Sequence, residues 1–292
     1  MQREKQIKSG RLLEVDFYPI WKDGRRIPTR APKSKPSTAE QEKYNRQQAV
    51  KKIVRKINAN FDNSDVWMHP TYDPAKAPQT ETEARRDVVN YIRRVKTKRV
   101  AELKRVSRIL ERNPQDNRLQ QQFKKLNEPL RYVGVIEQKV YRSGALKGKT
   151  NWHFHIFMTG GIDRDILEDM WPHGMRTNVD RFQPERFGPE TAAKYIAKSP
   201  KGFRKFFCSK NLKKSEEAKP KDGKISKLGV ERLAKMRIDD AAYWEKRYKG
   251  YRFIRCFARY NNYNCHWYIS VVMYKANNDI EIPNWGFDEW LE

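Results

Sequence analysis

The chain has 292 residues, and its 62 lysines and arginines outnumber its 36 aspartates and glutamates, giving a formal charge of +26. Such an imbalance is typical of proteins that meet phosphates, and no apolar run approaches the roughly 20 residues that span a bilayer. The first residues lack the apolar stretch of a secretory signal, and three scattered cysteines match neither a disulfide framework nor a zinc site. We therefore expect a basic, cytoplasmic protein that binds nucleic acid and not membrane.

Residues 1–60 form a basic segment that we expect to be peripheral and partly helical. A short strand is indicated near Leu12, and a polar tract with several prolines follows it. Ser37 or Thr38 can cap a helix that runs to about Asn58. The basic residues of that helix would face either solvent or DNA.

The ordered core is predicted to begin with a strand over residues 65–72, which two prolines end. His69 precedes a proline, so we expect it to be extended and structural rather than catalytic. Two polar, basic helices over 80–112 and 117–126 would then form an insertion in the core.

Two strands, 131–140 and 151–158, are joined by a glycine-bearing loop and predict an antiparallel hairpin. Because side chains alternate along a strand, His153 and His155 share one face, where two imidazoles can bind a divalent metal with a third ligand. Glu137 is the expected third ligand, since a carboxylate within a central strand needs a partner. Gln138 would replace Glu137 if the strand were turned over.

A Tyr-x-x-Lys sequence from Tyr195 to Lys198 falls on a predicted helix, where residues three apart are neighbours. A second copy begins at Tyr243, but its helix is densely charged and we do not expect that tyrosine to react. Between the two copies, basic and aromatic residues alternate, as they do where bases stack and lysines follow a backbone. The expected DNA-binding residues are Arg204, Lys205, Phe206, Lys210, Lys213 and Lys214.

Together with later elements, these strands and helices predict an α+β fold. One central antiparallel sheet of about five strands would have helices packed on one face and the imidazoles on the other, open face. The later elements are a helix over 162–171, a strand near 175–180, a charged linker over 214–227, a helix over 230–248 and a hairpin over 251–274. We expect a core domain over 61–213, with the inserted helices at 80–126, and a region over 214–292 that completes or flanks it.

The order of these motifs resembles the HUH endonucleases, in particular the rolling-circle replication initiators of bacterial plasmids, filamentous-type phages and integrated elements. The resemblance runs from about residue 60 to the end of the chain and implies the ferredoxin-like fold of that family. The matching segments are Thr71-Tyr72-Asp73 for the first motif, His153-Phe154-His155 for the metal motif, Tyr195 to Lys198 for the nucleophile motif and Ser209 to Lys214 for a basic stretch.

The resemblance implies that His153, His155 and Glu137 hold Mg²⁺ or Mn²⁺, which polarises the scissile phosphate of single-stranded origin DNA. Tyr195 would attack that phosphate and leave a 5′-phosphotyrosine and a free 3′-OH that primes replication. Lys198 would orient the phosphate or ease proton loss from the phenol. No helicase-type phosphate loop occurs in the chain, so a separate helicase and a polymerase are the implied partners.

Two other functions stay open. A conjugative relaxase or a transposase of the same superfamily is one, although a relaxase usually places its tyrosine before the histidines and adds a third histidine. We expect neither feature here. The other is a nucleic-acid-binding protein without enzymatic activity, in which the histidine pair belongs to the core. A covalent protein–DNA adduct would separate an enzyme from such a binding protein.

Overall fold

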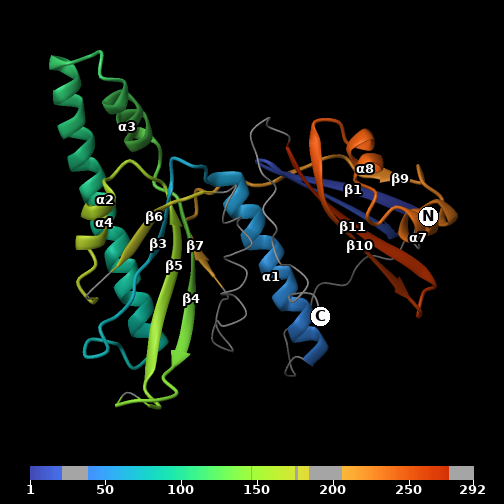
Figure 1. The fold of residues 1–292 in the computed structure, drawn as a ribbon, viewed down its shortest axis with the longest axis horizontal. Helices are drawn as coiled ribbons and strands as arrows, with labels where there is room; N and C mark the ends of the chain where they lie inside the picture. Colours follow the sequence, from blue (N-terminus) through green and yellow to red (C-terminus); the bar gives the residue numbers. More distant parts are fainter. Residues whose placement is uncertain (22–38, 146, 175–176, 184–205, 276–292) are drawn as a thin grey trace. The chain divides into compact units, whose positions relative to one another are not determined.

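The computed structural model describes residues 1–21, 39–145, 147–174, 177–183 and 206–275. Contacts divide the chain into two compact units (Figure 1), which we treat separately. The first unit comprises the described residues of Met1–Glu42 and Lys214–Ile282, and the second those of Lys43–Lys213. Each unit contains its own antiparallel sheet with helices, so the predicted α+β class is confirmed. None of the described helices is long and apolar enough to cross a membrane.

The second unit contains a five-stranded sheet in the order β6-β3-β5-β4-β7. All neighbouring strands are antiparallel, which confirms the predicted central sheet of about five strands. The strands are β3 (Val66–His69), β4 (Tyr132–Val140), β5 (Thr150–Met158), β6 (Asn178–Arg181) and β7 (Phe207–Cys208).

Helices α2 (Glu81–Arg112) and α4 (Arg164–Asp169) pack on one face of this sheet, and α3 (Asn117–Asn127) packs against α2. Figure 1 shows α2 lying along the sheet. The alternation of β5 directs Phe154 and Ile156 into the core shared with α2, where both are fully buried beside Tyr91. Burying these apolar side chains is the main force that holds α2 on the sheet.

The opposite face of the sheet carries the imidazoles and is partly covered, although we predicted an open face. Phe61 directly follows α1 (Ala39–Asn60) and packs against Phe157 of β5, with ring centroids 6.4 Å apart. Phe157 also stacks on Trp67 of β3 at 5.4 Å. Aromatic packing therefore fills one end of this face, beyond His155.

Arg99 of α2 joins three segments of the second unit through backbone carbonyls. Its Nη2 donates to the carbonyls of Lys125, Leu126 and Glu128 at 2.8 to 3.0 Å, beside the end of α3. Its Nη1 donates to the carbonyls of Thr159 and Gly160, directly after β5. The residue is buried, and burial lowers the pKa of its guanidinium below the ordinary value. A buried charge is tolerated here because several carbonyl dipoles surround it.

The first unit contains a second sheet in the order β10-β11-β2-β1-β8, with β9 also paired to β1. Helices α7 (Lys227–Met236) and α8 (Ala241–Arg247) pack Val230 and Trp244 against Phe17 of this sheet. The strands are β1 (Gln2–Ser9), β2 (Leu12–Pro19), β8 (Glu216–Glu217), β9 (Lys221–Asp222), β10 (Tyr251–Asn261) and β11 (His266–Lys275).

Three expectations about the ends of the chain are wrong. Residues 1–60 are not peripheral, because β1 and β2 are inner strands of the sheet in the first unit. The hairpin β10–β11 joins that sheet rather than the sheet with the histidines. The helix predicted over 230–248 is two helices, since α7 ends at Met236 and Asp240 caps a new helix. All three cysteines are free.

The Arg99 cluster generates a prediction about stability. Arg99→Met keeps most of the side-chain volume but leaves buried carbonyls without their donor, so the free energy of unfolding should fall by about 3–5 kcal/mol. Arg94→Met, on the exposed side of the same helix, should change it by less than about 0.5 kcal/mol. Urea unfolding followed by circular dichroism measures both, and equal changes in the two variants would contradict the role assigned to Arg99.

Candidate active site

The register of β4 and β5 places the predicted ligands together. Glu137 lies directly opposite His153, and Val135 lies opposite His155. Directly paired residues of antiparallel strands project from the same face, so Glu137 shares the face of both imidazoles. Gln138 pairs with Trp152 and projects from the other face. The register predicted for Glu137 is confirmed, and the strand is not turned over.

Glu137 and His155 are in direct contact inside the sheet. Their side chains are 12% and 8% exposed, and Oε2 of Glu137 lies 3.2 Å from Nε2 of His155. His153 is half-buried, and its Nδ1 lies 3.5 Å from Oγ1 of Thr71. A carboxylate this buried needs a proton, a cation or hydrogen-bond donors around it. The contact with His155 meets part of that need.

His69, which we predicted to be structural, lies beside the pair. It is extended at the end of β3, as predicted, and its Nδ1 is 2.8 Å from Nδ1 of His155. The two rings meet edge to face with centroids 5.0 Å apart. The expectation that no third histidine joins the pair is therefore wrong. Period-two alternation puts His69 and Thr71 on one face, but only the pairing of β3 with β5 brings them to the histidines.

The contact between His69 and His155 couples their tautomers. Burial, and to a smaller extent the neighbouring His155, lowers the pKa of His69 to about 4, so its ring is neutral near pH 7. Two neutral imidazoles satisfy a contact between Nδ1 atoms only when one donates and the other accepts. If His69 donates, Nε2 of His155 carries a proton toward Glu137. If His69 accepts and the ring of His155 is neutral as well, Nε2 of His155 presents a lone pair that can bind a cation.

The three residues of the first motif have different surroundings. Thr71 forms a backbone bridge with His153 and so belongs to the site. Tyr72 is buried in the core under α2, where its hydroxyl donates to Asp87 at 3.0 Å. Burial, followed by the charge of Asp87, raises its pKa and so disfavours the phenolate form. Asp73 accepts a hydrogen bond from the backbone of Ala75 and stabilises a turn.

The predicted nucleophile and part of the predicted DNA surface lie outside the described residues. These are Tyr195, Lys198, Arg204 and Lys205. Of the remaining predicted DNA contacts, Phe206 is half-buried, whereas Lys210, Lys213 and Lys214 are exposed. Asn60 holds the backbone of Lys213 through two hydrogen bonds of 2.8 and 3.1 Å. Exposed ammonium groups at a chain position held this way suit contact with a nucleic-acid backbone.

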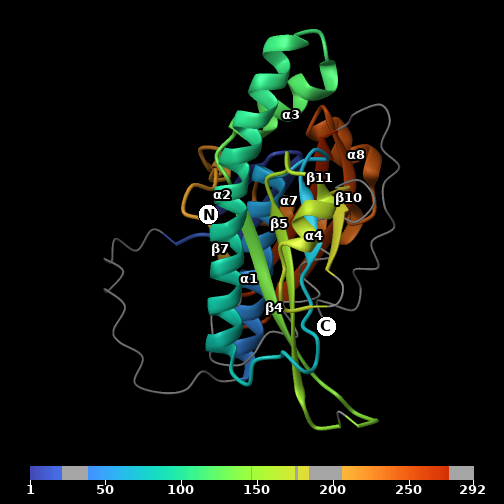
Figure 2. The same ribbon diagram turned by 90° about the vertical axis from the view of Figure 1, so that its left-hand side faces the viewer.

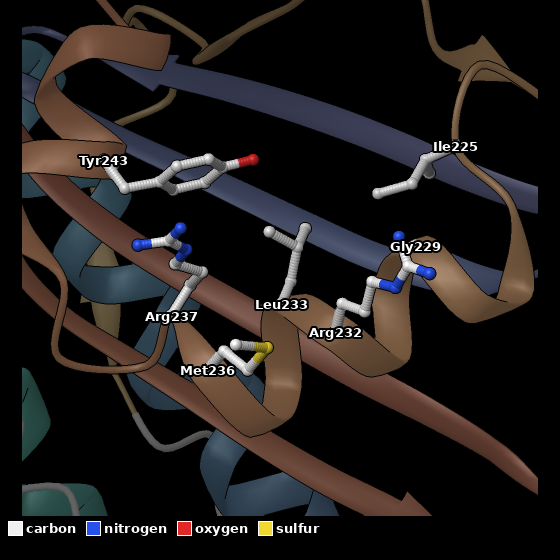
Figure 3. Close-up of a pocket in the computed structure, with 7 residues that line it drawn as sticks. All are labelled: Ile225, Gly229, Arg232, Leu233, Met236, Arg237 and Tyr243. Atoms are coloured by element: carbon white, nitrogen blue, oxygen red, sulfur yellow. The ribbon is translucent and has the colours of Figure 1, made fainter.

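Tyr243, of the second Tyr-x-x-Lys sequence, belongs to the first unit and lines a pocket of about 290 Å³ (Figure 3). Its hydroxyl accepts from Nη1 of Arg247 at 3.1 Å, and the guanidinium carbon of Arg237 lies 5.3 Å from its ring centroid. The lining residues are Ile225, Gly229, Arg232, Leu233, Met236, Arg237 and Tyr243. None of these seven is a metal-binding histidine or carboxylate, so this pocket lacks the groups that the histidine face offers.

The histidine face fits a divalent cation in the kind of donor it offers. Imidazole and carboxylate are ligands that Mn²⁺ accepts, and the contact of 3.2 Å between His155 and Glu137 is close to the roughly 3 Å between neighbouring ligand atoms of a small octahedral ion. Within the described part of the chain, no three His, Cys, Asp or Glu side chains are arranged so that they could hold a metal ion together. Binding of a cation would therefore require movement of these side chains and, at His155, the tautomer that leaves a lone pair on Nε2.

Comparisons with known proteins found no relative. No family model matches the chain, and no curated protein or solved structure is significantly similar to it. The functional argument therefore depends on the motifs of this sequence and on the geometry of the histidine face.

The shared face of Glu137 and the histidines generates a prediction about metal binding. Glu137→Ala should weaken Mn²⁺ binding by at least tenfold, because a charged ligand is lost. Gln138→Ala should leave the affinity within about twofold, because its side chain projects from the other face. Titration with Mn²⁺ followed by electron paramagnetic resonance measures both. Equal affinities in the two variants would remove Glu137 from the ligand set.

A second prediction concerns His69. His69→Ala should lower the affinity for Mn²⁺ by roughly tenfold, the usual effect of removing a partner that orients a metal-binding histidine. His173→Ala is the matched control, since His173 is another half-buried histidine of the second unit and packs on Tyr72 and Trp171. The same titration should show an unchanged affinity in that control. An unchanged affinity for Mn²⁺ in His69→Ala would show that the contact between His69 and His155 does not affect metal binding.

Proposed function

We propose that this protein initiates rolling-circle replication by nicking single-stranded origin DNA, with Tyr195 as the nucleophile, in the cytoplasm of a bacterial host. The observation that most supports the proposal is the shared face of Glu137, His153 and His155, with a third imidazole from His69 in contact. Sequence order adds to this support, because the Tyr-x-x-Lys sequence follows the histidine strand as it does in the replication initiators that the chain resembles.

Glu137, His153 and His155 would hold Mg²⁺ or Mn²⁺. A bound cation supplies positive charge beside the scissile phosphate, where negative charge increases during the reaction. His69 holds the ring of His155 by its Nδ1 contact, and Thr71 lies beside the ring of His153. These neighbours limit the rotation of both imidazoles, so less conformational entropy is lost when the site is completed.

In the proposed reaction, the phenolic oxygen of Tyr195 attacks the phosphorus and a new oxygen–phosphorus bond forms. The bond from phosphorus to the 3′ oxygen breaks, and that oxygen takes up a proton to become the 3′-OH. The phosphate stays attached to Tyr195 as a 5′-phosphotyrosine. A phenol with an ordinary pKa of about 10 is mostly protonated at neutral pH, and Lys198 would assist its proton loss or orient the phosphate. A separate helicase would open the duplex ahead of a polymerase.

A second candidate function is nucleic-acid binding without catalysis. One observation favours it: hydrogen bonds from His69 to His155 and from His155 to Glu137 can satisfy these groups without any metal. In that case the histidine pair would stabilise the sheet, and the basic residues would account for the whole function. A relaxase is favoured by the third imidazole but not by the position of Tyr195 after the histidines.

The proposal is tested by covalent trapping. The protein is incubated with Mn²⁺ and labelled single-stranded oligonucleotides that cover its own replicon, and a denaturation-resistant adduct is sought. Tyr195→Phe should abolish the adduct and leave oligonucleotide affinity within about twofold, because only the attacking oxygen is lost. Tyr243→Phe, in the second Tyr-x-x-Lys sequence, is the matched control and should form the adduct normally. Tight binding with no adduct from any oligonucleotide would favour the binding protein.

A further inference from the structure

The solvent face of α2 is strongly basic. The helix buries Val88, Tyr91, Val95 and Val106 in the core, and the other side of its circumference faces solvent. Exposed arginines and lysines occur on that side along most of the helix. The basic face, as we name it, consists of Arg93, Arg94, Lys96, Lys104, Arg108 and Arg112.

The basic face lacks the acidic partners of an ordinary solvated helix. Among the described residues, none of its six cations forms an ion pair. The acidic residues of α2 are engaged elsewhere: Glu81 pairs with Arg85, and Glu102 is buried between Lys98 and Arg105. Glu111 is the one exposed acidic residue within α2. Uncompensated like charges repel one another and attract a polyanion.

The basic face is also rigidly presented. Figures 1 and 2 show the later part of α2, with α3 beside it, projecting past the end of the sheet. Arg99 anchors α2 to the end of β5 at the start of this projection. From Arg93 to Arg112 the helix rises by about 28 Å at 1.5 Å per residue, which is about four fifths of one turn of duplex DNA. The helix backbone therefore spaces the cations over the length of about eight base pairs.

We propose that the basic face of α2 binds the phosphate backbone of double-stranded DNA. This inference rests on the proposed function, in which the partner would be the duplex that flanks the nick. A single strand fits this surface less well, because Tyr91 is buried and the exposed side of α2 has no aromatic ring on which bases could stack. A membrane fits less well too, since Val89 and Val100 are the large apolar residues exposed on α2 and neither can anchor it in lipid.

The basic face and the histidine face lie on opposite sides of one sheet, since α2 packs on the face that carries Phe154 and Ile156. Duplex binding and strand cleavage should therefore be separable. Loss of charge on α2 should weaken binding to origin duplex while nicking of a short single-stranded oligonucleotide continues at its normal rate. The contacts are to phosphates, so the effect should not depend on the sequence of the duplex.

The test compares two triple variants with equal loss of charge. Lys104→Gln, Arg108→Gln and Arg112→Gln remove half of the basic face. Lys219→Gln, Lys224→Gln and Lys249→Gln remove three exposed lysines from the first unit and serve as the matched control. Fluorescence anisotropy measures the affinity of each full-length protein for a 20-base-pair duplex and for a 20-nucleotide single strand at several salt concentrations. Thermal unfolding checks that both variants fold.

The α2 triple variant should bind the duplex at least tenfold more weakly, with a salt dependence reduced by about 2 to 3 in the slope of log K against log salt. The control variant should stay within about threefold. Equal losses in both variants would show a general charge effect and overturn the proposal. An equal loss for the single strand, or an unchanged duplex affinity with lost binding to phosphatidylglycerol vesicles, would also overturn it. Covalent trapping with Tyr195→Phe is independent of this result, so the two proposals fail separately.

Discussion

The antiparallel pairing of β4 with β5 is the constraint on which the candidate site depends. A slip of one residue would exchange Glu137 for Gln138 opposite His153, because side chains alternate between faces. The slip is opposed by Phe154 and Ile156, which are fully buried on the other face. The apolar packing that attaches α2 to the sheet therefore also determines which polar side chains meet on the histidine face.

Arg99 lies in α2 between a part of the helix that packs on the sheet and a part that packs on α3. Before Arg99, the apolar stripe of α2 packs on the sheet, and after it the helix continues past the strands with α3 as its neighbour. The guanidinium connects the two parts by donating hydrogen bonds to backbone carbonyls directly after β5 and at the end of α3. A single desolvated arginine with five carbonyl acceptors can do this, whereas a lysine has no planar fork to reach them.

The histidine face contains a chain of contacts rather than an isolated pair. His69 contacts His155, and His155 contacts Glu137. The tautomer of one ring therefore determines whether the facing atom of its neighbour donates or accepts the hydrogen bond. Without a cation, the chain is a satisfied hydrogen-bond network. With a cation at Nε2 of His155, that ring would carry its proton on Nδ1 and donate it to Nδ1 of His69, which would carry its own proton on Nε2. The arrangements with and without a cation therefore differ in the tautomers of both His69 and His155.

Local patterns in the sequence determined the α+β class, the hairpin of residues 131–158 and the shared face of His153, His155 and Glu137, because each depends on a period of two and a short loop. The tertiary structure decided where distant segments pair. His69 reaches His155 only through the pairing of β3 with β5. Strand β2 becomes an inner strand by pairing with β11, and β1 by pairing with β8 and β9. Such pairings depend on the total burial of apolar surface across the whole fold, which no local period records.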